Sequence, residues 1–492
     1  MKYISKSHNS ALGVALVLLT LSENHHKKRG IMAKLAFPGA GVILAISLFL
    51  TLSSGVAWAE EPLLGKRIFT FMSVVRVNQI EVARDRNVGH DEAAIHTIEA
   101  VQAVRDNFTK AFPGGRMTWA FSWLALHDPR ENYVGIRKQI VEYQKKYGDE
   151  VTFIPGAYFA PMYNTREQVN KDLHDGLKLV SEMVGGGYRP KSVVAGFLAA
   201  ENQLYLAEKE NIHVVQGTIW SQYGIDNGDG DGSISYPYYP STEHYCKPAQ
   251  RSSDFIDTVC LDGWTCDFLT ARRPGFAGGF NSRQSLGPIE TFMNLGPDLG
   301  LKEQMFVTAM HYDDGFKRNG FAWTTSIWEV CLGAKTFANL PAYGEEVRRR
   351  WPDMQCMTVG DFGETFRRQF KNNSKLDYRF VERGSGIHGS DANLEIRWFM
   401  NRDFRLALIH DWTKEGDAEK VLDFTRYDLT AEEPKDFGRN WSLINMINQK
   451  GVRPQDKPVP LSELSHEDQS IIRRRLPDLF AKAAAKRPVS KR

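Results

Sequence analysis

The stretch SVVAGFLAAENQLYLAEKENIHVVQGTIW, residues 192–220, decides the fold class. It begins and ends with apolar runs, SVVAGFLAA and HVVQGTIW, and continuous runs of this kind are typical of strands buried on both faces. The segment between them, NQLYLAEKEN, has apolar residues at helical spacing. A strand, a helix and a strand in this order predict two parallel strands joined by a helix that covers the sheet.

The same alternation extends outward from this stretch. RIFTFMSVVRV, MTWAFSWLAL and VTFIPGAYF are predicted strands, and the segments after them have helical spacing, with Gly148 closing one helix and Thr165 opening another. Closer to the C-terminus, QMFVTAMHY and MQCMTVGDF are predicted to be further strands. Repeated units of this kind predict an α/β fold whose parallel sheet is covered on both faces or closed into a barrel.

Changes in residue composition and in the spacing of apolar residues divide the chain into four predicted regions. Residues 1–59 are a signal region, and residues 60–370 form the α/β domain. Residues 371–432 form a small C-terminal β region, because LDYRFVERG, ANLEIRWFMN and FRLALIHDW alternate apolar and polar residues. Residues 433–492 are an extension that contains a basic helix.

The N-terminal region has the pattern of a secretory signal peptide. From Met32 the chain reads MAKLAFPGAGVILAISLFLTLSSGVAWAEE, with a Lys near the start, an apolar core and a small-x-small site at Ala57 to Ala59. We expect Met32 to be the true start and cleavage to follow Ala59. The short apolar run favours cleavage over a membrane anchor. The mature protein is therefore expected to be secreted or periplasmic, with no stable membrane insertion.

Charge and cysteine content narrow the class of protein. The 62 Lys and Arg residues nearly balance the 59 Asp and Glu residues, for a net charge of +3, and no basic motif predicts a nucleic-acid partner. Cys246, Cys260 and Cys266 lie close together in sequence, so one disulfide is expected among them. No C-x-x-C pair is present, which argues against a zinc–thiolate site.

A Gly- and aromatic-rich excursion from about residue 220 to 300 interrupts the alternation. Within GIDNGDGDGSISYPYYPS, residues 224–241, the spacing of Asn227, Asp229 and Asp231 imitates the start of a calcium loop. The closing Glu is missing, because the twelfth position is Tyr238, so a solvated Gly-rich turn is the alternative. We expect bound Ca²⁺ that directs Tyr236, Tyr238, Tyr239 and His244 toward the mouth of the barrel.

Polar and aromatic residues follow most of the predicted strands. Because the carboxyl ends of parallel strands carry the active site in α/β barrels, these residues are candidate site residues. Carboxylates, aromatic faces and amides are the groups that a carbohydrate site needs. The candidate carboxylates are Glu201, Asp313 and Asp314, and the candidate substrate-binding residues are Arg76, Asn78, His127, Trp220, Gln222, Tyr223, Tyr238, His244, Trp264 and His311.

The segment YRPKSVVAGFLAAENQLYLAEKENIHVVQG, residues 188–217, resembles the fourth-strand region of the glycoside hydrolase/deacetylase superfamily. The resemblance implies a (β/α)7 barrel, with Glu201 as the nucleophile after strand four and Asp313 or Asp314 as the acid/base after strand seven, as in family-57 glycoside hydrolases. The chain departs from the family pattern after strand one, where SVVRVNQ contains neither the His of family 57 nor the paired Asp of the deacetylases.

These observations predict a secreted carbohydrate-active enzyme. The preferred prediction is a retaining glycoside hydrolase that acts on a polysaccharide or oligosaccharide. One alternative is a metal-dependent carbohydrate deacetylase or esterase with His127, Asp128 and His311 as ligands. A second alternative is a non-catalytic carbohydrate-binding protein. In the structural alternative, Glu201 interacts only with a helix dipole, and the two aspartates only cap a helix.

Overall fold

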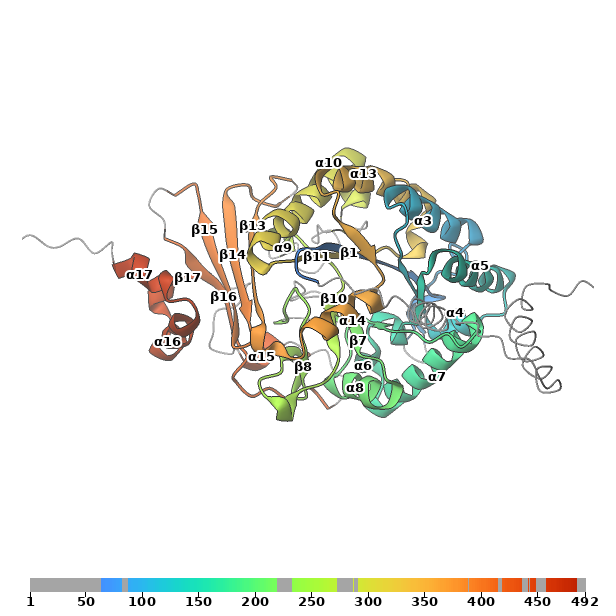
Figure 1. Cartoon of the computed structure of the whole chain (residues 1–492), viewed down its shortest axis with the longest axis horizontal. Coiled ribbons are helices and arrows are strands. Elements are labelled where there is room, and N and C mark those ends of the chain that lie inside the picture. The colour runs from blue at the N-terminus through green and yellow to red at the C-terminus, as the bar shows by residue number, and fades with distance from the viewer. Residues whose placement is uncertain are drawn as a thin grey trace, which may run out of the picture. The chain divides into compact units, whose positions relative to one another are not determined.

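A parallel sheet around β1 (Arg67–Val75) forms the centre of the α/β part in the computed structural model of the protein (Figure 1). The strand order is β11 (Ala322–Ile327), β1, β4 (Thr118–Phe121) and β5 (Glu150–Phe153), and β12 (Gln355–Met357) also pairs with β1. All of these pairs are parallel. The first four strands are buried along nearly their whole length, which is why their sequences are continuous apolar runs.

The described residues belong to a compact unit that begins at Pro62. They are residues 63–81, 87–218, 232–271, 286, 291–387, 389–414, 418–435, 441, 443–447 and 457–484. No helix in these ranges is long and apolar enough to cross a membrane.

A second parallel sheet has the order β10 (Val259–Asp262), β7 (Val214–Thr218) and β6 (Val193–Val194). It approaches the first sheet at both edges. The hydroxyl of Thr152 in β5 donates to the carbonyl of Ser192 beside β6, and Thr265 N donates to Thr325 O of β11 at 3.1 Å. The strand ladders of the described residues do not close into a barrel, so the fold they show is mixed α/β.

Helices follow the strands and lie around them (Figure 1). The longer ones are α3 (Ile98–Ala111), α5 (Glu131–Tyr147), α7 (Arg166–Val184) and α13 (Leu340–Arg350). The predicted start of α7 and the predicted end of α5 are confirmed. The Thr165 side chain caps α7 by accepting from Gln168 N, and Gly148 ends α5 with a φ of 74°. The shorter elements are β2 (Asn78–Glu81), β3 (Asn87–Asp91), α4 (Trp123–His127), α6 (Ala160–Tyr163), α8 (Ala200–Tyr205), β8 (Pro240–Ser241), β9 (His244–Pro248), α9 (Phe268–Ala271), α11 (Phe316–Asn319), α12 (Gly333–Phe337) and α14 (Val359–Gln369).

The prediction that QMFVTAMHY forms a strand is wrong. These residues belong to α10 (Phe292–Ala309) and to the π-helical turn Met310–Gly315 that continues it. Their buried positions include Val307, Thr308 and His311, which recur at helical rather than alternate spacing. The strand of this region is β11, which starts only after Gly320 ends the short helix α11.

An antiparallel sheet follows the α/β part and packs against it (Figure 1). Its five strands are β13 (Asp377–Arg383), β14 (Leu394–Asn401), β15 (Phe404–Asp411), β16 (Lys420–Arg426) and β17 (Val459–Pro460). The sheet thus extends beyond residue 432, where the sequence placed its end. One face joins the core of the α/β part, and α16 (His466–Arg475) and α17 (Asp478–Ala484) cover apolar residues of the other. The short helix α15 (Leu443–Ile447) lies between β16 and β17 in sequence.

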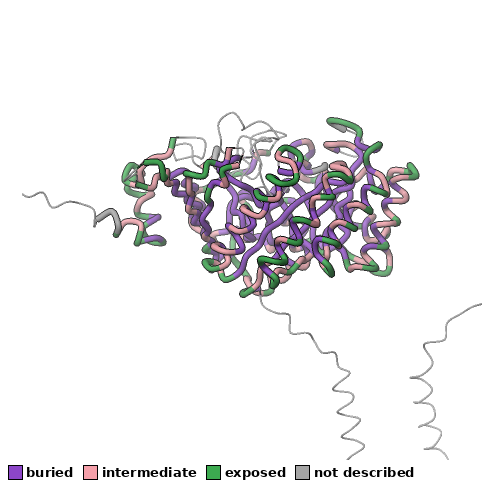
Figure 2. The backbone as a smooth tube through the Cα atoms, turned by 90° about the horizontal axis from the view of Figure 1, so that it is seen from above, coloured by how far each residue is buried: buried purple, intermediate pink, exposed green. Residues whose placement is uncertain are grey.

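Residues 232–241, the described part of the quoted aromatic stretch, are all buried, and buried residues fill the interior of the compact unit (Figure 2). Tyr236, Tyr238 and Tyr239 are all fully buried in the core shared by the α/β part and the antiparallel sheet. Tyr236 stacks on Tyr378 of β13, with ring centres 4.9 Å apart. These tyrosines therefore join two parts of the fold and do not present a surface to a sugar.

Candidate functional site

Arg76 directly follows β1 and is nearly fully buried, with two carboxylates around its guanidinium group. Its Nε and Nη2 donate to Glu92 Oε2 and Oε1 at 2.6 and 2.9 Å. Its Nη1 and Nη2 donate to Glu329 Oε1 and Oε2 at 3.2 and 2.8 Å. Cys331 Sγ lies 3.7 Å from Nη2. We call Arg76, Glu92, Glu329, Cys331 and the adjacent Tyr158 the Arg76 cluster.

The fold brings these groups together at the carboxyl ends of neighbouring strands. Arg76 comes directly after β1 and Glu329 comes two residues after β11, and these two strands pair in parallel. Glu92 comes directly after β3, in the hairpin that follows β1, and its backbone N donates to Val77 O at 2.7 Å. Catalytic residues of parallel α/β folds come from this end of the strands.

Tyr158 lies against the guanidinium, with its ring centre 5.8 Å from Arg76 Cζ. Its φ is 91°, a conformation that is uncommon for a residue other than glycine and that recurs at functional sites. Phe197 N donates to the Tyr158 carbonyl at 3.1 Å, and a Cβ at Gly196 would lie 2.7 Å from that oxygen. The glycine after β6 thus permits the contact that helps to hold Tyr158 in place.

The hydroxyl of Tyr158 is a neutral group at the edge of this cluster. Burial raises its pKa well above the ordinary value, and the charge of Glu329 raises it further. No hydrogen bond of normal geometry joins this hydroxyl to a described residue. The hydroxyl oxygen is buried, and a hydrogen-bond interaction with Glu329 also contributes to the raised pKa of Tyr158.

Buried groups behind the cluster fix its backbone. Glu81 accepts hydrogen bonds from Val77 N at 2.8 Å and from the Ser122 hydroxyl at 2.7 Å, and burial raises its pKa. His96 Nε2 accepts from the Arg76 amide at 3.4 Å, so its Nδ1 carries the proton that is donated to the Glu92 carbonyl at 3.0 Å. Burial lowers the pKa of His96, which stays neutral.

The cluster places two carboxyl groups against one permanent cation. Burial opposes the charge of Arg76, but Glu329 and Glu92 outweigh it and raise the arginine pKa well above its ordinary value. Both carboxyl groups pair with the arginine, Glu92 at 2.6 Å and Glu329 at 2.8 Å. Glu92 Oε1 and Glu329 Oε2 both accept from Nη2 of Arg76, at 2.9 and 2.8 Å, so the guanidinium lies between the two carboxyl groups.

Glu201 lies in the first turn of α8, and 55% of its side chain is exposed. Its Oε2 is 3.6 Å from Arg166 Nε, and the helix dipole favours a carboxylate at this position. The buried carboxylate nearby is Glu433, which accepts from Ala200 N at 2.9 Å and from Tyr245 N at 2.8 Å. Burial raises the pKa of Glu433 to about 7.

Asp313 and Asp314 lie in the π-helical turn before β11 and do not follow a strand. Asp313 pairs with Arg350 and accepts from the Trp351 indole at 2.8 Å, and Asp314 accepts from Arg318 at 2.7 Å. The neighbouring carbonyl of Tyr312 accepts from Arg67, the first residue of β1.

The predicted strand-end position of the two aspartates is therefore wrong. They lie toward the amino end of β1, whereas Arg76 follows its carboxyl end, and a strand of 9 residues spans about 30 Å. Glu201 shares no partner with Asp313 or Asp314 among the described residues. The structure does not bring the predicted catalytic pair together.

The predicted metal ligands are also separate. His127 ends α4, and the carboxylate of Asp128, next to it, binds the Arg130 guanidinium at 2.9 Å. His311 is buried in the turn before β11, where the Tyr236 hydroxyl contacts its Nδ1 at 3.0 Å. In the described ranges, no group of three or more His, Cys, Asp or Glu side chains could hold a metal ion.

Of the remaining predicted substrate contacts, His244 and Tyr238 are core residues. His244 Nδ1 accepts from Cys246 N, so its Nε2 donates to the Trp441 carbonyl at 3.1 Å, and burial lowers its pKa to about 3. The Tyr238 hydroxyl donates to Tyr245 O at 2.8 Å. Neither side chain has any exposed surface, so neither faces a substrate.

The Trp264 indole donates to Ile327 O at 3.4 Å at the end of β11, so Trp264 lies close to the Arg76 cluster. Asn78, another predicted substrate contact, is the first residue of β2. The expected disulfide is absent, because none of Cys246, Cys260 and Cys266 is disulfide-bonded in the structure. Six predicted site residues lie outside the described ranges: Trp220, Gln222, Tyr223, Asn227, Asp229 and Asp231.

Asp267 and Glu382 are a second group of buried carboxyls, and both are fully enclosed. Glu382 accepts from Leu269 N at 2.9 Å and from the Trp398 indole at 3.1 Å. Burial raises the pKa of Glu382 well above its ordinary value, and Asp267 raises it further. The Arg76 cluster is the better candidate site, because the half-buried Cys331 beside it brings it closer to the surface.

Glu92 and Glu329 were not among the residues predicted from sequence, whereas Tyr158 was noted as a polar residue that follows a predicted strand. Glu329 could have been found, because AWTTSIWE is a continuous apolar run that ends in a carboxylate. The strain at Tyr158 and the pairing of Glu92 with Arg76 depend on tertiary contacts and leave no local signal.

The fold and site thus define a mixed α/β protein with buried ionisable groups at the carboxyl ends of its parallel strands. Residues 61–400 match a family described as a domain of unknown function with a solved structure (DUF3863), and residues 405–479 match a second such domain, DUF3864. The first match covers more than half of the chain, so the protein belongs to the DUF3863 family. No curated protein matches the chain.

A crystal structure from Parabacteroides distasonis, described as a candidate glycoside hydrolase/deacetylase, is 50% identical to the chain with a TM-score of 0.81. The match covers 85% of this chain and 100% of that one. A candidate polysaccharide deacetylase from Mycobacterium smegmatis has 15% identity and a TM-score of 0.41, covering 64% of this chain and 93% of its own. A family-57 branching enzyme from Pyrococcus horikoshii has 11% identity and a TM-score of 0.36, with coverages of 60% and 70%. Scores this low for the last two do not bear on function.

Proposed function

We propose that the protein is a carbohydrate-active hydrolase whose reaction takes place at the Arg76 cluster. The observation that carries the proposal is the 50% identity to the candidate glycoside hydrolase/deacetylase over the whole of that chain. The position of the cluster supports it, because its ionisable side chains gather at the carboxyl ends of β1 and β11. The reaction that we propose is cleavage of a glycosidic bond in a polysaccharide or oligosaccharide.

In this proposal Glu329 replaces Asp313 and Asp314 as the acting carboxylate, because it follows the strand whose end those residues were expected to occupy. Glu329 exchanges a proton with the bridging oxygen or with water, and Arg76 remains paired with Glu92 during this step. The neutral Tyr158 hydroxyl donates to a sugar oxygen. A retaining reaction also requires a nucleophile, for which Glu92 is the nearest carboxylate.

The proposal extends to the architecture. We infer that β1, β4, β5, β6, β7, β10 and β11 make up one distorted barrel of the (β/α)7 type, as in the glycoside hydrolase/deacetylase superfamily. The contacts between Thr152 and Ser192 and between Thr265 and Thr325, at the two edges where the sheets approach, support this inference. A crystal structure would test it by showing whether the ladders close.

The decisive experiment incubates residues 60–492 with neutral, acidic and acetylated polysaccharides and measures reducing ends and free acetate. Reducing ends released by the wild type, but not by Glu329→Gln, support glycoside hydrolysis at this site. Acetate release that stops with a chelator supports the metal-dependent deacetylase. Binding without release of either product supports a non-catalytic carbohydrate-binding protein. Lack of both binding and turnover contradicts all three functions.

Export and calcium remain proposals from the sequence. N-terminal sequencing of the protein from its native host is expected to begin at Glu60, and an uncleaved cytoplasmic chain would contradict export.

The loop with Asn227, Asp229 and Asp231 lies outside the described ranges. We propose that it binds Ca²⁺ through oxygen ligands, so calorimetric titration of metal-free protein should give heat with Ca²⁺, and Asp229→Asn with Asp231→Asn should abolish it.

A further inference from the structure

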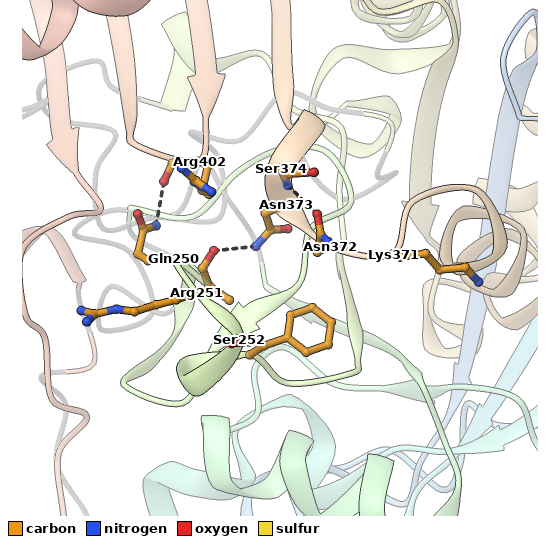
Figure 3. Close-up of a pocket in the computed structure, with 10 residues that line it drawn as sticks. Gln250, Arg251, Ser252, Lys371, Asn372, Asn373, Ser374 and Arg402 are labelled. Carbon is orange, nitrogen blue, oxygen red and sulfur yellow. Dashed lines mark hydrogen bonds between the residues drawn. The ribbon is translucent and has the colours of Figure 1, made fainter.

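A cavity of about 410 Å³ opens between three segments that are distant in sequence (Figure 3). One wall is the turn after β9, another is the segment between α14 and β13, and the third is Arg402 in the turn between β14 and β15. The cavity shares no lining residue with the Arg76 cluster.

Buried polar contacts hold the three walls together. Asn373 donates to Tyr239 O at 2.7 Å and to Ala249 O at 3.2 Å, and its Oδ1 accepts from Tyr239 N at 2.9 Å. Gln250 Nε2 donates to the Arg402 carbonyl at 2.8 Å, which ties the first wall to the third (Figure 3). The cavity is therefore built by fixed contacts and does not depend on the flexible ends of surface side chains.

The lining is cationic and contains no carboxylate. Arg251 and Lys371 are exposed and form no ion pair with a described residue. Their side chains extend outward in opposite directions from the two sides of the cavity (Figure 3). Arg402 adds a third cation, 3.6 Å from Asp403. The nearest acidic group beneath the turn, Asp254, is buried, and its oxygens accept from Gln250 N, Arg251 N and the Ser241 hydroxyl. The Asp254 oxygens are thus occupied by these donors, and Asp254 does not line the cavity.

The other lining groups suit a sugar ring. Both amide hydrogens of Gln250 are used by carbonyls, so its Oε1 remains to accept from a hydroxyl. Asn372 Oδ1 accepts from Ser374 N at 2.9 Å, so its NH₂ group remains to donate. Phe255 is half-buried and supplies an apolar face.

We propose that this cavity binds an acidic oligosaccharide, whose carboxylate or sulfate groups on separate sugar units pair with Arg251 and with Lys371 on the two sides of the cavity. The proposal rests on the proposed function only in taking the ligand to be a carbohydrate. It adds that the polymer recognised by the protein is acidic and that it is held at a second position, apart from the Arg76 cluster. Arginine and lysine together can bind either anion, so the experiment uses both.

The test is calorimetric titration of the full mature chain with three probes: a tetrasaccharide of galacturonic acid, a sulfated galactose tetrasaccharide and an uncharged galactose tetrasaccharide. At least one anionic probe should bind, and the double variant Arg251→Ala/Lys371→Ala should weaken its binding about tenfold or more, because one hydrogen bond to a charged group contributes that factor. The matched control is Lys138→Ala/Lys209→Ala, which removes two exposed cations elsewhere. This control should bind like the wild type, and all melting temperatures should agree.

Three results would overturn the proposal: neither anionic probe binds, the uncharged probe binds equally well, or the cavity variant binds like the control variant. The anionic probe that binds best indicates whether the group is a carboxylate or a sulfate. The outcome is separable from the proposed function, because binding is measured without turnover. Hydrolysis of a neutral polymer without binding of either anionic probe would remove this proposal alone, whereas binding without any product would remove only the hydrolase.

Discussion

Two arginine–carboxylate groups in this protein show how far the same chemistry can differ with its surroundings. Arg76 pairs with Glu92 and Glu329 at the carboxyl ends of β1 and β11, and all three side chains are about one-tenth exposed or less. Arg350 pairs with Asp313 beyond the other end of β1, where the two side chains are 46% and 40% exposed. The sequence had singled out the second carboxylate, and the structure places the first at the candidate site.

The difference teaches that the energetic contribution of an arginine–carboxylate pair depends on its burial. A solvated pair contributes about 0–1 kcal/mol, because water screens it and both side chains lose freedom when they pair. A buried pair has lost its water, so each partner depends on the other, and removal of one leaves an uncompensated charge. Each prediction below compares a buried group with an exposed one, starting from the largest expected effect.

The first prediction concerns catalysis. Glu329→Gln should lower turnover of the substrate by about 10²–10⁴-fold, the range contributed by a proton-transferring group. Glu201→Gln and Asp313→Asn should leave turnover within about twofold of the wild type, because their carboxylates are exposed and paired elsewhere. Steady-state kinetics on the three variants, with the folded state checked by circular dichroism, make the measurement.

A full loss of turnover in Glu201→Gln with normal activity in Glu329→Gln would reverse the comparison. It would return the nucleophile to the end of β6, as the superfamily resemblance implies. Tyr158→Phe sharpens the result further, since it removes only the buried hydroxyl beside Glu329. If that hydroxyl donates to the sugar, the variant should lose rate or affinity without loss of stability.

The second prediction concerns stability. Arg76→Met keeps much of the apolar volume of the side chain but leaves Glu92 and Glu329 buried without their counter-charge. The free energy of unfolding should fall by about 3–5 kcal/mol, as measured by urea denaturation near neutral pH. A loss below about 1 kcal/mol would mean that water reaches the cluster, and the contrast with the exposed pair would disappear.

Much of the fold could be predicted from the sequence, because strand and helix periods are local signals. The strands at Arg67–Val75 and Val214–Thr218 and the caps at Thr165 and Gly148 are all present. The error at QMFVTAMHY arose because a buried helical segment and a buried strand are both apolar, and spacing over nine residues does not separate them. That error placed the candidate carboxylates at the wrong end of β1.

The candidate site could be predicted only in part, for a physical reason. Arg76 was identified because it comes directly after a strand, which is a local property. The pairing of Arg76 with Glu92 and Glu329 depends on the hairpin after β1 and on the position of Glu329 after β11, 253 residues away from Arg76 in sequence. Contacts at that separation leave no trace in spacing. Tyr236, Tyr238 and His244 looked like a binding surface because polar aromatic side chains suit a core as well as a sugar site.

The third prediction uses pH to compare Glu433 with Glu201, two carboxylates beside Arg166. Burial raises the pKa of Glu433 from 4.5 to about 7, so the fold favours its protonated form. The corresponding stability is fully present below about pH 4.5 and is lost as the pH rises through about 7, a difference on the order of 3 kcal/mol.

Glu433→Gln mimics the protonated carboxyl group and should remove this dependence. The variant should match the wild type in unfolding free energy at pH 5 and exceed it at pH 8. Glu201→Gln is the control, since its side chain is 55% exposed, and it should leave the pH profile of stability unchanged. Parallel profiles for Glu433→Gln and the wild type between pH 5 and 8 would contradict the assignment.

The fourth prediction has the smallest expected effect and tests the exposed side of the comparison directly. Arg350→Met removes the partner of Asp313, but water can solvate the freed carboxylate, and the Trp351 indole still donates to it at 2.8 Å. The unfolding free energy should therefore change by only about 0–1 kcal/mol, and less in high salt, where exposed pairs are screened. Urea denaturation at low and high ionic strength, alongside Arg76→Met, provides the measurement. A loss as large as that of Arg76→Met would mean that the Asp313 pair is desolvated in solution, and burial would no longer distinguish the two ends of β1.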